Sequence, residues 1–304
     1  MRQISLQGHR GARGLLPENT LPSLIEPFEY GMHGIEFDVQ LSRDDQVVIY
    51  HDLRLKSSIT RNSRNNWVQK TGPAIRSLNL KQLKEYKLGR INKKTAYGLR
   101  FRKQARLPDQ TIPTLYELVE FLDQCKLSNV ILNIEIKHSP LEPDLCPEPV
   151  YIAEKIVNEI NNLKISKRCI VQCFDWSVIQ AVKQFDSALA ISCLTTIDPV
   201  LDTLSPHKGK ASLWNAGLDI RDFNNNAVDM VAQFNADYWT PNYINLTKSQ
   251  IGQAHNHNLG VMTWTVNNPL TMRRLMKWGI DAVISDYPDK LDIAHRQWKS
   301  TLAQ

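Results

Sequence analysis

Eight short apolar segments alternate with helix-like segments along most of the chain. They are centred near residues 4, 35, 131, 169, 189, 237, 261 and 282. Strands separated by helices favour a parallel sheet, and eight such units in 304 residues are typical of a (β/α)8 barrel. An open, doubly wound sheet is the alternative, but the sequence has no GxGxxG or GxxxxGKS/T phosphate loop. We therefore expect a TIM-like α/β barrel in one domain over residues 1–304, with an irregular connection at 195–223 that includes a short helix near Val200.

The alternation is interrupted between residues 53 and 112, where the sequence is basic, rich in Asn and Ser, and only weakly periodic. From Arg54 to Arg106 this stretch carries 16 Lys or Arg residues and one acidic residue, Glu85. We interpret residues 53–112 as an inserted basic subdomain that follows the second strand–helix unit and covers a site. Its charge could attract an anionic substrate, nucleic acid or a membrane surface, or it could be a solvated face without such a role.

Two apolar strands carry carboxylates at alternate positions. Glu36 and Asp38 lie two residues apart, so their side chains face the same direction, and Glu135 and Lys137 repeat the arrangement. Buried carboxylates are unfavourable unless they pair with cations or bind a metal. Oxygen ligands suit Mg²⁺, Ca²⁺ or Mn²⁺ better than zinc. We expect Glu36, Asp38 and Glu135 to bind one divalent cation; a salt-bridged or solvated group of carboxylates is the alternative.

Two histidines and two cations accompany these carboxylates. His9 and His51 each follow a predicted strand, and an imidazole can accept or donate a proton near neutral pH. On opposite sides of a phosphorus atom they would act as base and acid. Arg10 and Lys137 would neutralise phosphate oxygens. Trp264 could line the site or pack in the core. We interpret the remaining histidines as structural: His33, His138, His207, His255, His257 and His295.

The positions of these residues along the strands support a shared site. In a barrel of this kind, active sites lie at the carboxyl ends of the strands. The candidates that fall at such ends are His9, Glu36, Asp38, Glu135, Lys137, Phe174 and Trp264.

The sequence also predicts the cellular context. No run of about 18 apolar residues occurs, so we expect no stable membrane insertion. The N-terminal residues pass directly into a predicted strand and leave no room for a secretory signal, so we expect a cytoplasmic location, where availability favours Mg²⁺ over Ca²⁺. Five cysteines without a CxxC pair predict buried thiols and no disulfide framework.

Several short motifs occur in order along nearly the whole chain. They are HRG (9–11), PENT (17–20), GIEFDV (34–39), HD (51–52), IPTL (112–115), NIEIK (133–137), QCFD (172–175), TWTVN (263–267) and DAVISDYP (281–288). Together they resemble the glycerophosphodiester phosphodiesterase family. The resemblance implies a TIM-like barrel and metal-dependent hydrolysis of glycerophosphodiesters to sn-glycerol 3-phosphate and an alcohol. It implies one divalent ion as cofactor, with Mg²⁺ favoured and Ca²⁺ as the alternative, and a small-molecule substrate.

The resemblance also assigns roles to individual residues. Glu36, Asp38 and Glu135 match the family's metal ligands, and His9 and His51 match its acid–base pair. By the same match, the phosphate-binding cations are Arg10 and Lys137, and the pocket also includes Phe174 and Trp264. The region after His51 matches a subdomain that partly covers the active site. Cys173 stands where the family commonly has Ser, so local substrate contacts could differ. We take His9 as the base and His51 as the acid, an order that the sequence does not fix.

Two other classes of protein share some of these features. Phospholipases of the phosphatidylinositol-specific and sphingomyelinase D types combine a similar barrel with a histidine pair, but would favour an apolar rim. A phosphate- or nucleic-acid-binding module could use the basic segment, and binding of nucleic acid would depend steeply on salt. That segment has few aromatic residues that could stack on nucleic-acid bases. They are Trp67, Tyr86, Tyr97 and Phe101. We therefore favour the enzyme and expect no nucleic-acid partner.

Overall fold

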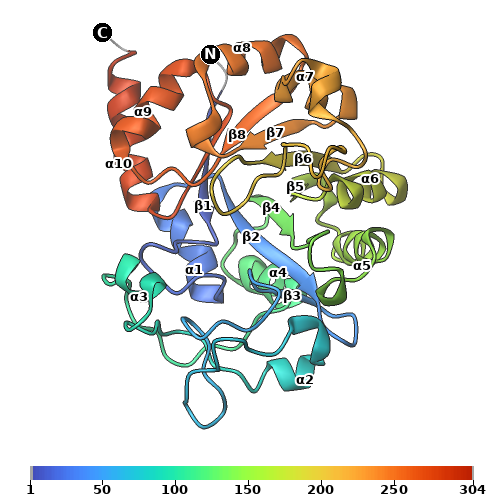
Figure 1. Cartoon of the computed structure of the whole chain (residues 1–304). Coiled ribbons are helices and arrows are strands. Elements are labelled where there is room, and N and C mark those ends of the chain that lie inside the picture. The colour runs from blue at the N-terminus through green and yellow to red at the C-terminus, as the bar shows by residue number, and fades with distance from the viewer. Residues whose placement is uncertain (1–2, 303–304) are drawn as a thin grey trace.

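The computed structural model describes residues 3–302 and contains a closed parallel barrel (Figure 1). Its strands are β1 (Ser5–His9), β2 (Gly34–Leu41), β4 (Ile131–Ile136), β5 (Cys169–Cys173), β6 (Ala190–Thr195), β7 (Tyr238–Pro241), β8 (Gly260–Thr263) and β9 (Ala282–Ser285). The strands pair in parallel in the order β1-β9-β8-β7-β6-β5-β4-β2, and pairing of β1 with β2 closes the barrel. The short strand β3 (Val47–Ile49) extends β2 as an antiparallel partner. The predicted TIM-like barrel is confirmed.

Helices surround the barrel. They are α1 (Leu21–Ile25), α4 (Leu115–Gln124), α5 (Pro149–Asn162), α6 (Trp176–Phe185), α7 (Ala227–Phe234), α8 (Lys248–Asn256), α9 (Pro269–Trp278) and α10 (Pro288–Ser300). All but α5 and α10 begin at a residue whose side chain caps the helix. Thr114 and Glu117 form a capping box at the start of α4, and Thr247 and Gln250 form another at α8. Such caps satisfy the free backbone N–H groups at helix starts.

Strand β2 explains how one segment can serve both the core and a site. Ile35, Phe37 and Val39 are buried in the apolar layer between the barrel and its helices. Glu36 and Asp38 alternate with them and face the opposite side, the barrel interior. All residues of β2 are buried, so the two carboxylates are held away from bulk water. The fold therefore keeps acidic groups at a place where they need a compensating partner.

Residues 53–112 contain only short helical turns. These are the 3₁₀ helix η2 (Ile75–Ser77) and the α-helices α2 (Leu80–Leu83) and α3 (Ala96–Arg100). An apolar cluster of their own includes Leu55, Ile75 and Leu83. Several basic side chains of the segment pair with acids just outside Arg54–Arg106, in the pairs Lys56–Asp52, Arg61–Asp109, Arg76–Asp45 and Lys84–Glu117. These pairs reduce the excess of positive charge that the composition suggests.

Two expectations about local structure require correction. Residues near Val200 form no helix; Ile197 and Asp202 make an isolated antiparallel bridge, and Asp198 accepts backbone hydrogen bonds from Val200 and Leu201. Backbone hydrogen bonds across this bridge, from Asp198 N–H to Leu201 O and from Thr203 N–H to Thr196 O, use groups that a helix would need.

The cysteines follow their prediction only in part. All five are free, but Cys125 is exposed and Cys146 is half-buried.

Among residues 3–302, every helix is too short or too polar to span a lipid bilayer.

Candidate active site

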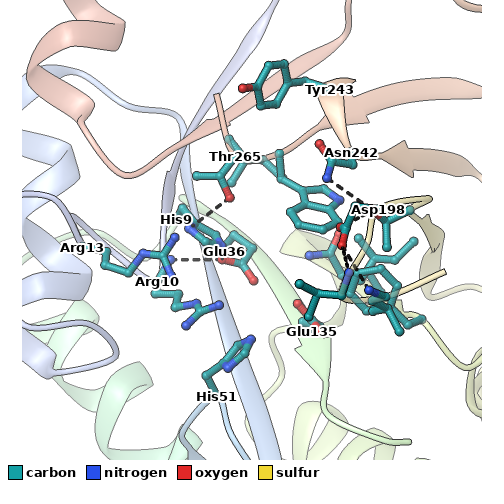
Figure 2. A pocket seen from close by; sticks show the side chains of 18 of the residues that line it. His9, Arg10, Arg13, Glu36, His51, Glu135, Asp198, Asn242, Tyr243 and Thr265 are labelled. Carbon is teal, nitrogen blue, oxygen red and sulfur yellow. Dashed lines mark hydrogen bonds and ion pairs between the residues drawn. The ribbon is translucent and has the colours of Figure 1, made fainter. Parts of the chain in front are cut away.

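A cavity of about 960 Å³ opens at the carboxyl end of the barrel. Its wall includes His9 from β1, Glu36 from β2, Glu135 from β4 and the segment that follows β8. Figure 2 shows these side chains converging on one space. The sequence-predicted residues that line the cavity are His9, Arg10, Glu36, His51, Glu135, Lys137, Phe174 and Trp264. Asp38 is the exception, because its side chain is fully buried behind the wall.

The three predicted metal ligands form one cluster. One carboxylate oxygen from each of Glu36, Asp38 and Glu135 lies within 4.8 Å of the others. The register of the barrel brings them together, because Asp38 in β2 lies beside Glu135 in β4. Lys137 pairs with Glu135, and its Nζ lies 3.7 Å from Asp38 Oδ1. Asp38 Oδ1 is buried and accepts no hydrogen bond among the described residues.

The electrostatics of this cluster fit a bound cation. Burial raises the pKa of Glu36 well above its usual value, and the charges of Asp38 and Glu135 raise it further. Burial also opposes ionisation of Asp38, but His51, Arg10 and Lys137 outweigh it and hold the Asp38 pKa below its usual value. Crowded carboxylates and a buried carboxylate oxygen without a hydrogen bond are conditions that a hard divalent ion would relieve. The donor set, oxygen only, suits Mg²⁺ or Ca²⁺.

His9 is held in one orientation by an aspartate near the C-terminal end of the barrel. His9 Nδ1 lies 2.7 Å from Asp286 Oδ1. The Asp286 carboxylate also accepts hydrogen bonds from Arg13 Nε at 2.6 Å and Asn267 Nδ2 at 2.6 Å. Burial opposes ionisation of Asp286, but Arg13 and His9 outweigh it, so the Asp286 pKa lies far below its usual value. An ionised Asp286 can only accept, so His9 Nδ1 carries the proton.

The other nitrogen of His9 therefore faces the carboxylate cluster without a proton. Nε2 lies 3.7 Å from Glu36 Oε2. Burial and, to a smaller extent, the charge of Arg13 lower the pKa of His9 to about 4, although Asp286 opposes them. His9 is thus neutral at pH 7, the state in which an imidazole can accept a proton.

His51 has a different environment from that of His9. Its side chain is 25% exposed, and Nδ1 lies 3.4 Å from Asp52 Oδ1. Asp52 is ionised because His51 and Lys56 outweigh the effect of burial and hold its pKa below the usual value. Figure 2 shows His51 apart from His9, with Arg10 extending between them. The two histidines therefore approach the cavity from different positions, and His51 is the one nearer to solvent.

The two predicted cations lie between carboxylates. Arg10 Nη1 donates to Glu18 Oε1 at 2.9 Å, and Arg10 Nε lies 3.4 Å from Asp38 Oδ2. The backbone N–H of Arg10 donates to Glu36 Oε2 at 3.0 Å. Arg10 and Lys137 both reach the cavity wall, where positive charge can meet an anion.

Aromatic side chains form another part of the wall. The ring of Phe174 is 5.5 Å from that of Trp264 and 6.4 Å from that of Trp214, with both pairs near perpendicular. Trp264 Nε1 donates to the backbone oxygen of Thr240 at 3.1 Å, which fixes the indole. This apolar face suits the organic part of a substrate.

Several residues that shape the site were not singled out from the sequence. Glu18, Asn267 and Asp286 lie within the motifs that carry the family resemblance, and this position could have identified them as candidate site residues. Asn19, whose Nδ2 donates to Asp38 Oδ2 at 2.8 Å, belongs to the same group. Arg13 and Trp214 had no such signal.

His138, interpreted as structural, also reaches the cavity. Its Nδ1 lies 2.8 Å from Asp175 Oδ2 and its Nε2 lies 3.0 Å from the backbone oxygen of Pro147. These contacts tie the ends of β4 and β5 together and agree with a structural role.

The fold and the site together define a (β/α)8-barrel hydrolase with an oxygen-rich, histidine-flanked centre at the carboxyl end of its strands. The model of the "Glycerophosphoryl diester phosphodiesterase family" matches residues 9–290. The chain therefore belongs to the glycerophosphoryl diester phosphodiesterase family, whose members are phosphoric diester hydrolases.

Individual relatives agree with this assignment. A glycerophosphodiester phosphodiesterase of Caldanaerobacter subterraneus subsp. tengcongensis is 26% identical over 283 residues, which cover 93% of this chain and 94% of the relative. The crystal structure of a "Putative glycerophosphoryl diester phosphodiesterase" from Silicibacter pomeroyi DSS-3 is 25% identical with a TM-score of 0.85, and the match covers 99% of this chain and 94% of that one. An Oleispira antarctica phosphodiesterase, solved with the product sn-glycerol-3-phosphate, shares the fold at 21% identity with a TM-score of 0.69 over 96% of each chain.

Proposed function

We propose that the protein hydrolyses glycerophosphodiesters to sn-glycerol 3-phosphate and an alcohol, and that the reaction depends on one divalent metal ion. The observation that carries this proposal is the cluster of Glu36, Asp38 and Glu135 beside the unprotonated Nε2 of His9. Family membership and the name of the Caldanaerobacter relative support the same reaction. The substrate is a small molecule that fits the cavity.

The three carboxylates would hold the ion, which would supply positive charge to the phosphodiester and so stabilise charge in the transition state. We expect Mg²⁺, which typically binds through few carboxylates together with substrate phosphate oxygens, and take Ca²⁺ as the alternative. Arg10 and Lys137 offset charge on the non-bridging phosphate oxygens. Phe174 and Trp264 contact the organic part of the substrate.

The two histidines divide the proton transfers. His9, held by Asp286 with Nε2 free, accepts the proton of the nucleophile, which is water or the glycerol hydroxyl of the substrate itself through a cyclic phosphate. His51 donates a proton to the leaving oxygen. The difference in their surroundings supports this order, because the rigid, neutral imidazole suits a base and the more exposed one can be reprotonated from solvent.

A direct assay tests the reaction class. Glycerol 3-phosphate release from glycerophosphocholine should occur with Mg²⁺, be lost with EDTA, and return when Mg²⁺ is restored in excess. A parallel series with Ca²⁺ ranks the ions. No release with either ion from a folded protein would contradict the proposal, and phospholipid substrates would then be tested first.

We further propose that residues 53–112 cap the active site, with residues 1–304 as a single catalytic domain. Leu53 and Arg100 of this segment line the cavity, which supports this arrangement. The cytoplasmic location and the absence of a nucleic-acid partner stay predictions. The oligomeric state is not predicted.

The charge of the cap leads to a salt dependence. If the segment attracts anionic diesters, kcat/KM should fall by about three- to tenfold between 50 and 500 mM KCl at saturating metal, because mobile ions screen long-range attraction. Arg100→Gln should reduce this slope, since Arg100 lies at the cavity. Lys70→Gln makes the same change of charge at an exposed position outside the cavity and should not. A kcat/KM that is independent of salt would remove the steering role.

A further inference from the structure

Helix α3 contacts residues 10–18, the segment that contains Arg10 and Arg13 of the site. Figure 1 places α3 beside α1, which follows that segment directly. The hydroxyl of Tyr97 in α3 donates a hydrogen bond to Glu18 Oε2. The other oxygen of Glu18 accepts from Arg10 Nη1 at 2.9 Å. Tyr97 is thus connected to Arg10 through a single carboxylate.

Burial and charge make this connection well defined. Burial opposes ionisation of Glu18, but Arg10 and Arg13 outweigh it and keep the Glu18 pKa below its usual value. Burial, followed by the charge of Glu18, raises the pKa of Tyr97 well above its usual value, so the hydroxyl keeps its proton and donates. The buried carboxylate of Glu18 accepts one hydrogen bond from a guanidinium and one from a hydroxyl, so it has little freedom to move. Glu18 therefore restrains the guanidinium of Arg10, whose Nε lies near Asp38.

A second set of contacts reaches Arg13. The ring of Phe101, the residue after α3, lies 5.0 Å from Arg13 Cζ, within range of a cation–π interaction. Gln104 Nε2 donates to the backbone oxygen of Arg13 at 2.7 Å. Phe101 and Gln104 are both buried. Arg13 in turn binds Asp286 through Nε and Nη2, and Asp286 binds His9.

We propose that Tyr97, Phe101 and Gln104 are positioning residues through which the 53–112 segment fixes Arg10 and His9 for catalysis. The proposal rests on the proposed function, since it assigns Arg10 to the phosphate and His9 to proton transfer. It gives the segment a task besides covering the cavity or attracting anions. Tyr97 acts through Glu18 on Arg10, and Phe101 and Gln104 act through Arg13 and Asp286 on His9.

The first test removes only the hydroxyl of Tyr97. Tyr97→Phe should lower kcat/KM for glycerophosphocholine by about tenfold at a temperature where the variant is fully folded. Tyr116→Phe is the matched control, because Tyr116 also donates to a glutamate, Glu120, but on the exposed face of α4. The control should stay within twofold of the wild type.

A double-mutant cycle then asks whether Tyr97 acts through Glu18. Glu18→Gln should lower kcat/KM more than Tyr97→Phe does, and the double variant should fall no further than Glu18→Gln alone. A purely structural role would leave kcat/KM of the folded variants unchanged or give additive losses, and either result would overturn this arm of the proposal.

A binding measurement separates this inference from the proposed function. The affinity for sn-glycerol 3-phosphate, measured by titration calorimetry, should weaken about fivefold in Tyr97→Phe and stay unchanged in Tyr116→Phe. If the wild type released no product from any diester, the proposed function would fail, while this comparison of affinities would still decide whether Tyr97 positions Arg10. Equal affinities in Tyr97→Phe and the wild type would overturn that role.

Phe101→Leu tests the second set of contacts without leaving a polar group unpaired. Because His9 acts on the reacting atoms, kcat should fall about fivefold or more while KM changes less than twofold. Phe185→Leu makes the same change at an exposed position of α6 and should alter neither constant. An unchanged kcat in folded Phe101→Leu, or a loss confined to KM, would contradict positioning of His9 through Arg13.

Discussion

Replacing His9 with glutamine should lower kcat by about 10²- to 10⁴-fold, the range expected when a general acid or base is lost. Glutamine can still donate to Asp286, so the local structure is kept, but it offers no nitrogen that accepts the proton of the nucleophile. The variant should still bind its metal ion, as measured by the shift in Tm on addition of Mg²⁺. His257→Gln is the matched control, since His257 also pairs with an aspartate, Asp229, but lies outside the active-site cavity.

Substrates with different leaving groups distinguish the base from the acid. A p-nitrophenyl ester releases a weakly basic phenolate, so its leaving oxygen needs little help from an acid. Glycerophosphocholine releases a strongly basic alkoxide, which must be protonated as it leaves. His51→Gln should therefore lose far more activity on glycerophosphocholine than on the p-nitrophenyl ester. His9→Gln should lose similar factors on both. The reverse pattern would exchange the two roles, and near-normal turnover of His51→Gln on both substrates would contradict the acid–base scheme.

Glu36→Gln should abolish metal-dependent turnover and yet stabilise the metal-free protein. Burial and the neighbouring carboxylates raise the pKa of Glu36 in the folded state. The folded state then binds this proton more tightly than the unfolded state, so Glu36 lowers stability progressively as pH rises above the unfolded pKa. At pH 8 in EDTA, the glutamine variant should melt about 1 to 2 °C higher than the wild type, the change that about 1 kcal/mol produces in a chain of this size.

Metal reverses the order of stability in this comparison. Mg²⁺ should raise the Tm of the wild type, because an ion that binds only the folded state stabilises it, and should do so far less for Glu36→Gln. The Tm of the metal-free wild type should decline from pH 5 to 8 more steeply than that of the variant. Glu29→Gln, at an exposed position, controls for the loss of one negative charge. A metal-free variant that melts below the wild type at pH 8 would show that Glu36 contributes to stability through contacts that glutamine cannot replace.

The sequence predicts the fold well because the information is local. The alternation of Ile35, Phe37 and Val39 with Glu36 and Asp38 defines both faces of β2 before any neighbour is known. The barrel then follows from repetition of such units. The carboxylate cluster could be predicted for the same reason, since carboxylates at the carboxyl ends of neighbouring parallel strands lie near one another.

The parts of the site that could not be predicted depend on contacts between distant segments. Arg13 has no periodic or motif signal, and its role follows from Asp286, 273 residues away. Trp214 comes from an irregular connection whose path is set by packing rather than by backbone propensity. The helix expected near Val200 is absent for a related reason, because the bridge between Ile197 and Asp202 uses the backbone groups that a helix would need.

Pairing of β9 with β1 is the last strand pairing that synthesis allows, because β9 lies near the end of the chain. Ribosomes complete the histidine motif and all three candidate metal ligands in the first half of the chain, whereas Asp286 emerges near its end. Until β9 pairs with β1, His9 lacks the carboxylate that sets its protonated nitrogen. A nascent or prematurely terminated chain would therefore carry the candidate metal ligands without an oriented His9, and we expect turnover only once the last strand is in place.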